Sequence, residues 1–148
     1  AIVGMVIFVI GNMLVIILGG RDSVNARVEV LQNIRFASEK IRQLVYDSSS
    51  STVSGTCPFN TLTAIVGSAT TTVFISNGVL VSSSTQSEPL TSDFVTATTS
   101  APCFFTQIIN PLPAKPTIQF DLTIKYNDNG NSELIFSDSV RSAISQRK

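Results

Sequence analysis

The side chains best suited to chemistry in this chain of 148 residues are two cysteines, because histidine is absent. Histidine is the commonest general base, the usual partner of a nucleophilic Ser or Cys and the commonest metal ligand. Cys57 and Cys103 lie in loop-like stretches beside Pro58 and Pro102. A bridge between them would close a loop of about 47 residues and contribute several kcal/mol in the chain-entropy model. It would also imply an oxidising compartment, and two unpaired thiols are the alternative.

The run Asn127–Asn131, followed by Glu133, is the other group of chemically able side chains. Its oxygens could bind a cation, with Asp128 as the candidate ligand. An EF-hand register with Gly130 in sixth position would, however, put a lysine first and a phenylalanine twelfth. The run is therefore interpreted as a hairpin turn, and we expect no cofactor.

Charge and spacing argue against two further classes of function. Ten basic residues balance ten acidic ones, so no basic surface points to nucleic acid. The four lysines show no characteristic spacing from any serine, so Ser–Lys catalysis is not indicated. We expect a protein that is not an enzyme. Its many Ser and Thr residues could carry O-linked glycans.

Residues 1–20 form an apolar segment without an ionisable side chain, and Asn12 is its one polar residue. As a helix the segment would be about 30 Å long, the thickness of the hydrocarbon core of a bilayer. It lacks the basic start and the small-residue cleavage site of a secretory signal. We expect the following side chains to serve both membrane insertion and polymerisation: Ile2, Val3, Val6, Ile7, Phe8, Ile10, Met13, Leu14, Ile16, Ile17 and Leu18.

Residues 21–47 continue the helical pattern with one apolar face. The apolar positions recur every three or four residues, at Val24, Val28, Leu31, Ile34, Ile41, Leu44 and Val45. No proline interrupts residues 1–47, so one rod of about 70 Å can form. Gly11 with Asn12, and the pair Gly19–Gly20, are the positions where we expect any loosening of the helix.

Residues 48–148 alternate short apolar stretches with hydroxyl-bearing residues, which predicts a β-rich head. Asn77-Gly78 is a strong hairpin signal between strands at 71–76 and 79–84. Further strands are expected at 61–66, at 94–98 and at 118–126, with a returning partner near residues 134–140. The apolar face of residues 24–45 is the long helical surface that could cover one face of such a sheet. The fold class expected is α+β, with a long N-terminal α-helix packed on the small antiparallel β-sheet of the head.

This organisation resembles the type IV pilin and pseudopilin family, particularly its minor-pilin-like members. The resemblance spans nearly the whole chain. It lies in the apolar helix, in its continuation RVEVLQNIRFASEKIRQLVYDSSS, and in the later stretches VFISNGVLV, SEPLTSDFV, TIQFDLTIKY and SELIFSDSVRSA. The family's cleavage site after Gly, followed by Phe, Thr and a nearby Glu, is missing, and we expect it upstream of Ala1.

The resemblance implies a structural role. A pilin waits in the cytoplasmic membrane as a single-pass protein, and assembly machinery then moves it into a helical filament on the cell surface. Its partners there are copies of itself or related pilins, and its helix is often unwound in the middle, which here would fall at Gly11 and Asn12. Such filaments support attachment, motility or uptake. Two alternatives are a pseudopilin of a type II secretion-like system and a membrane-anchored binding module that does not polymerise.

Overall fold

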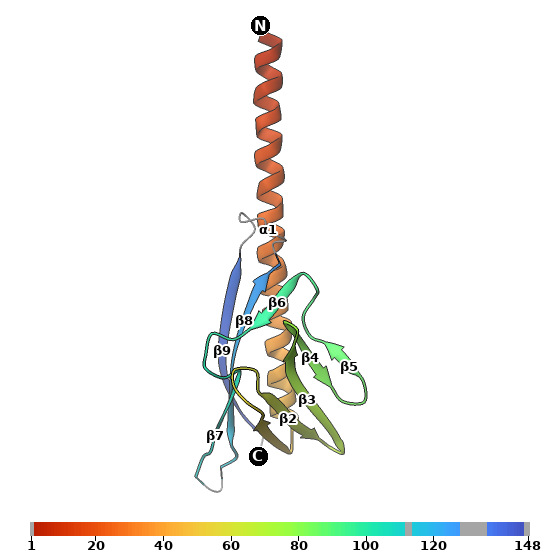
Figure 1. Ribbon diagram of the computed structural model, residues 1–148, viewed down its shortest axis with the longest axis vertical. Coiled ribbons are helices and arrows are strands. Elements are labelled where there is room, and N and C mark those ends of the chain that lie inside the picture. The colour runs from red at the N-terminus through yellow and green to blue at the C-terminus, as the bar shows by residue number, and fades with distance from the viewer. Residues whose placement is uncertain (1, 112–113, 128–135, 147–148) are drawn as a thin grey trace.

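The computed structural model describes residues 2–111, 114–127 and 136–146, with residues 2–5 described as backbone only. Within these residues one long helix, α1 (Ile2–Asp47), runs the length of the molecule, and nine strands gather around its C-terminal half (Figure 1). At 1.5 Å per residue α1 is about 69 Å long. Its N-terminal half extends beyond the strands. The α+β class expected from the sequence is confirmed.

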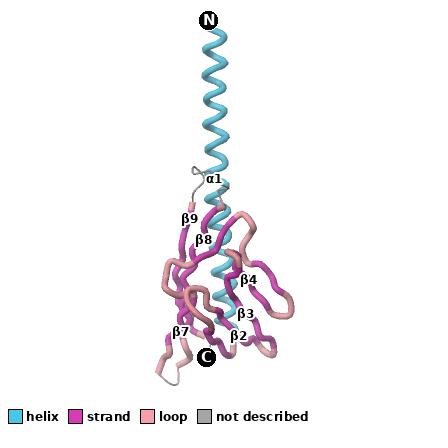
Figure 2. The backbone as a smooth tube through the Cα atoms, in the orientation of Figure 1, coloured by secondary structure: helices cyan, strands magenta, loops and turns pink. Residues whose placement is uncertain are grey.

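The strands form two antiparallel sheets instead of the single sheet that we expected. The first contains, in spatial order, β1 (Ser50–Ser54), β2 (Thr61–Val66), β3 (Ala69–Ser76), β4 (Val79–Ser83) and β5 (Ser87–Pro89). The second is built on β8 (Thr117–Tyr126). β9 (Ser137–Ser145) pairs with β8, as do both β6 (Val95–Thr98) and β7 (Phe105–Ile108). Figure 2 shows both sheets beside the same half of the helix.

Most of the expected strands are present. The hairpin at Asn77-Gly78 is confirmed, and both turn residues have positive φ, 50° and 77°, as a type I′ turn requires. Glycine is needed at Gly78 for a second reason, because a Cβ there would lie 2.8 Å from Thr96 Cγ2 on β6. The returning strand β9 pairs with β8 from Thr117↔Ser145 to Lys125↔Ser137. Leu134 and Asp128 lie outside the described residues, so the predicted cation ligand and most of its turn are not described.

β1, β5 and β7 were not expected. β1 lies in the serine-rich stretch that follows the helix, where we predicted no strand, and it pairs with β2 from Ser50↔Ile65 to Ser54↔Thr61. β5 and β7 are only three and four residues long, so no periodicity could identify them.

The core lies where α1 crosses both sheets. Helix residues at spacings of three and four meet residues of the first sheet, such as Leu62 and Leu80, and of the second, such as Phe120 and Ile124. The helix contributes Val30, Ile34, Ala37, Ile41 and Val45 to this core. All except Ile34 are fully buried.

This buried face corrects our expectation for the helix. Val24, Val28 and Leu31 were expected to cover the sheet, but they are 58%, 45% and 43% exposed. The face that packs contains Ala26 and Ala37 instead, two small residues that allow strands to approach closely. Hydropathy alone predicts that the larger apolar residues are buried. The close approach of the sheets to the helix instead favours small residues at the contact.

Candidate functional site: the exposed apolar half of the helix

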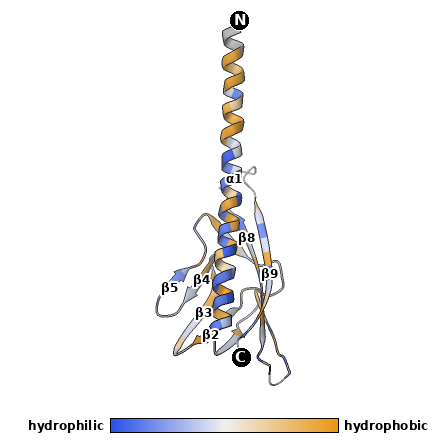
Figure 3. Cartoon of the chain, turned by 180° about the vertical axis from the view of Figure 1, so that it is seen from behind, coloured by the Kyte–Doolittle hydropathy of each residue, from blue (hydrophilic) through white to orange (hydrophobic). Residues whose placement is uncertain are grey.

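Among the described residues, the apolar side chains of the N-terminal half of α1 stand clear of the head. Figure 3 shows this half as an apolar rod that projects from the molecule. The large apolar side chains at residues 6–10 and 13–18 are between 52% and 73% exposed, which is what an isolated helix gives on every side. The described members of the predicted set are therefore together on one rod, and they touch no other element. Ile2 and Val3 lie in α1, but their side chains are outside the described residues.

This segment has the length and composition to cross a membrane. A helix from Val6 contains an 18-residue window of mean hydropathy 1.6, and none of that window is buried. Fully burying a large apolar side chain contributes about 1.5 to 3 kcal/mol. For eleven such side chains that comes to roughly 15 to 30 kcal/mol, against about 5 to 15 kcal/mol for the stability of a whole domain. The segment therefore requires an apolar environment that the head does not supply.

The exposed apolar surface does not stop where the charges begin. Val24, Val28 and Leu31 follow Met13 and Ile17 at helical spacing, on the side of α1 turned away from the buried face. An apolar stripe, interrupted between Ile17 and Val24 by Gly20 and Arg21, thus runs from the projecting rod about two turns into the head region. Sequence reasoning placed these residues in the core and so missed the stripe.

The glycines do not interrupt this rod in the single chain. α1 is continuous through Gly11, Asn12 and the pair Gly19–Gly20. A Cβ added at Gly11, Gly19 or Gly20 would meet nothing within 4 Å. These glycines are thus not required by any contact within the chain. Loosening at Gly11 and Asn12 was expected in an assembled filament, and it stays a prediction.

A polar network fixes the head to the helix just below the apolar half. Asn33 Oδ1 accepts a hydrogen bond from the Ser92 backbone N–H at 2.8 Å, and Ser92 Oγ donates to Glu29 Oε1 at 2.6 Å. Asn33 is buried although it is polar. Glu29, a charged residue of α1, thus holds the loop that follows β5. The network therefore joins the loop after β5 to the part of α1 that packs within the head.

The Cys57–Cys103 disulfide is present, as the sequence suggested, and ties the β1–β2 loop to the β6–β7 loop. Asn60, which lies buried in the β1–β2 loop, also holds the first residue of β7. Its Nδ2 donates to the Phe105 carbonyl at 2.7 Å, and its Oδ1 accepts from the Phe105 N–H at 2.8 Å. The bridge therefore joins the two sheets.

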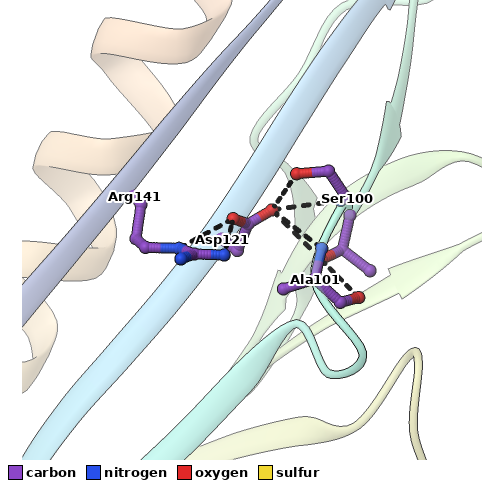
Figure 4. A network of polar contacts seen from close by, with 5 residues as sticks. Ser100, Ala101, Asp121 and Arg141 are labelled. Atoms are coloured by element: carbon purple, nitrogen blue, oxygen red, sulfur yellow. Dashed lines mark hydrogen bonds and ion pairs between the residues drawn. The ribbon is translucent and has the colours of Figure 1, made fainter.

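Asp121 on β8 fixes the other end of the β6–β7 loop (Figure 4). Its Oδ1 accepts hydrogen bonds from the Ser100 N–H at 3.0 Å and the Ser100 hydroxyl at 2.9 Å. Arg141 on β9 pairs with Oδ2 at 3.1 Å. Burial raises the pKa of Asp121, but the hydrogen bonds from Ser100, Arg141 and Ala101 outweigh it and leave that pKa below its usual value. The carboxylate therefore stabilises the head when ionised.

The head also has a groove of about 330 Å³ where the first sheet diverges from α1. Its floor includes Val73 and Leu90 from the core, and Lys40, Asp47 and Glu88 stand among the residues that line it. Among the described residues, no group of three or more Cys, Asp or Glu side chains is placed to hold a metal ion.

The exposed rod is thus the feature of the molecule that most requires a partner. Comparison of the chain with protein-family models, with curated proteins and with solved structures finds no match.

Proposed function

We propose that the chain is a structural subunit of a type IV pilus, held in the cytoplasmic membrane before assembly and polymerised through the apolar half of α1. The observation that carries this proposal is the exposure of residues 6–18 on all sides, outside a head that has a complete core of its own. A helix that served only the fold would be covered by it.

Polymerisation would change the surroundings of the apolar rod. Lipid tails satisfy the rod in the membrane. Moving the rod from lipid into water would cost the transfer free energy of all its apolar side chains. Extraction from the membrane therefore requires another apolar surface for the rod to contact. The same helix on neighbouring copies provides one, and packed side chains replace the acyl chains. Gly4 and Gly11, seven residues apart, would let helices approach closely on one side.

The outward stripe of Val24, Val28 and Leu31 favours polymerisation over simple anchoring. A single-pass anchor needs apolar residues only within the bilayer, and these three lie beside the folded head. In a filament they would continue the helix–helix contact below the apolar rod. For this reason we rank a membrane-anchored binding module that never polymerises below a filament subunit.

The test separates filaments from membranes in cells that express the chain with its native upstream sequence. Filaments sheared from the cell surface should contain the chain, and Val28→Lys should reduce that fraction about tenfold while the membrane pool is kept. Gln32→Lys adds the same charge at an exposed helix position outside the stripe and should leave the filament fraction unchanged. Recovery of the wild-type chain with membranes alone would contradict the proposal, and short filaments confined to the periplasm would favour a pseudopilin.

A further inference from the structure

The outer face of the five-stranded sheet, which faces away from α1, includes three register rows and, beside them, the pair Ser76↔Val79. The row Val53↔Leu62↔Val73 lies on the inner face, where Leu62 and Val73 are buried in the core. Residues one position along each strand therefore point to the outer face. The rows there are Ser50–Ile65–Thr70, then Thr52–Thr63–Thr72–Ser83–Ser87, then Ser54–Thr61–Phe74–Val81–Pro89.

The middle row places one hydroxyl on each of the five strands. Thr52 and Ser87 at its ends are exposed, and the three residues between them are half-buried. Threonine is stiff about χ1, so most of these hydroxyls are held in place before any ligand arrives. The last row supplies an apolar lane beside them, because Phe74, Val81 and Pro89 are direct cross-strand neighbours.

These thirteen positions contain no ionisable side chain, whereas about a quarter of an ordinary protein surface is charged. The second sheet is different, because Asp121, Lys125 and Arg141 lie on its strands. Removing water from an uncharged face costs little free energy when the partner is uncharged too. A charged partner would lose its water and find no opposite charge on this face.

We propose that this face is a docking surface for an uncharged, extended polysaccharide chain that crosses the strands along the row from Thr52 to Ser87. The strand spacing of about 4.8 Å is close to the length of one sugar ring in an extended β-linked chain, which gives one hydroxyl contact per ring. A pyranose ring has a rim of hydroxyls and faces of C–H groups, and the hydroxyl row and the lane of Phe74, Val81 and Pro89 match these two parts.

The dimensions favour this occupant over two others. The three rows cover about 19 by 14 Å, roughly 270 Å², which is well below the area of about 800 Å² per partner in a stable protein interface. A second copy packed face to face is therefore disfavoured. Five strands twist by about 80 to 100° in total, so the face is not a plane that a flat crystal such as ice could match. A single chain follows a twisted row by rotation about its glycosidic bonds.

The test measures depletion of the full-length protein in detergent by microcrystalline cellulose and by chitin. The wild type should bind at least one of them. Thr63→Lys, which puts a charge in the middle of the row, should weaken that binding at least tenfold. Thr63→Val, which removes only the hydroxyl, should weaken it several-fold. Ser139→Lys adds the same charge to an exposed position of β9 and is the matched control.

Equal thermal stability of the three variants would show that each remains folded. Absence of binding to both polymers would overturn the proposal, as would binding that Ser139→Lys and Thr63→Lys weaken equally. A Thr63→Lys effect on self-association or on ice growth alone would also overturn it, in favour of a second copy or of ice. Polymerisation is not needed in this experiment, so its outcome is independent of the proposed pilus function.

Discussion

The two halves of α1 have the same secondary structure and opposite surroundings. Residues 6–18 are exposed on every side, whereas Val30, Ala37, Ile41 and Val45 are fully buried against two sheets. Most of the stability of a protein helix comes from packing of an apolar face, not from propensity. The second half finds that packing within its own chain. The comparison shows that the first half finds no such packing among the described residues of its own chain.

The largest effect expected on the head comes from its disulfide. Replacing Cys57 and Cys103 by alanine removes a link across 46 residues of sequence, which the chain-entropy model rates at about 4 kcal/mol. The free energy of unfolding, measured with denaturant in detergent, should fall by about that amount. The helix content of the apolar half should be unchanged, because no bridge reaches it. A loss of helix signal from that half would remove the distinction between the two regions.

A pair of matched truncations tests the comparison itself. Ile41→Ala in the core should lower the free energy of unfolding of the head by roughly 2 to 5 kcal/mol, since it leaves a cavity. Ile10→Ala, the same change in the apolar half, should alter it by less than about 0.5 kcal/mol. Chemical denaturation of the two variants side by side provides the measurement. Similar losses in both would mean that the rod packs on the head.

The reverse experiment affects the rod alone. Met13→Arg puts a charge near the middle of the apolar segment, which costs about 2.5 to 3.5 kcal/mol in membrane insertion. The membrane-bound fraction should fall by more than tenfold in an insertion assay. Gln32→Arg, in the exposed part of the second half, is the control and should insert normally. If both variants inserted equally well, residues 6–18 would not be the membrane segment.

A smaller effect should follow from pH, and it belongs to the head only. The pKa of Asp121 is lowered in the fold, so its contribution to stability is fully present above its unfolded pKa, near 3.9. That contribution is lost as pH falls below this value toward the lower pKa of the folded state. Asp121→Asn should cost about 1.5 to 3 kcal/mol at pH 7 and flatten this acid dependence. Denaturation curves between pH 2 and pH 7 would show it, and an unchanged slope would mean that the network with Ser100 and Arg141 is not formed.

Much of the fold could be predicted because local patterns determined it. The helix, the Asn77-Gly78 hairpin and the long strand β8 have strong periodicity or turn chemistry. β1 could not be found, because a run of serines has no hydrophobic alternation and pairing with β2 alone makes it a strand. The buried role of Ala26 and Ala37 depends on how closely the sheets approach, which no single-chain pattern encodes.

The candidate site, too, could be predicted only in part from the sequence. The apolar rod follows directly from composition, and its exposure agrees with the length of the segment. The outward stripe of Val24, Val28 and Leu31 required knowledge of which helix face the sheets cover. The hydroxyl row across β1 to β5 required the strand register, because Thr52 and Ser87 are distant in sequence and share only a row.

The most direct test of the account is the state of the protein when detergent is removed. Analytical ultracentrifugation of the full chain should then show filaments or large assemblies. In these assemblies the backbone of residues 6–18 should be protected from hydrogen exchange, and the side chains of these residues should be inaccessible to labelling reagents. The head alone should look the same in detergent and without it. A stable monomer in water, with residues 6–18 folded against their own head, would contradict the account.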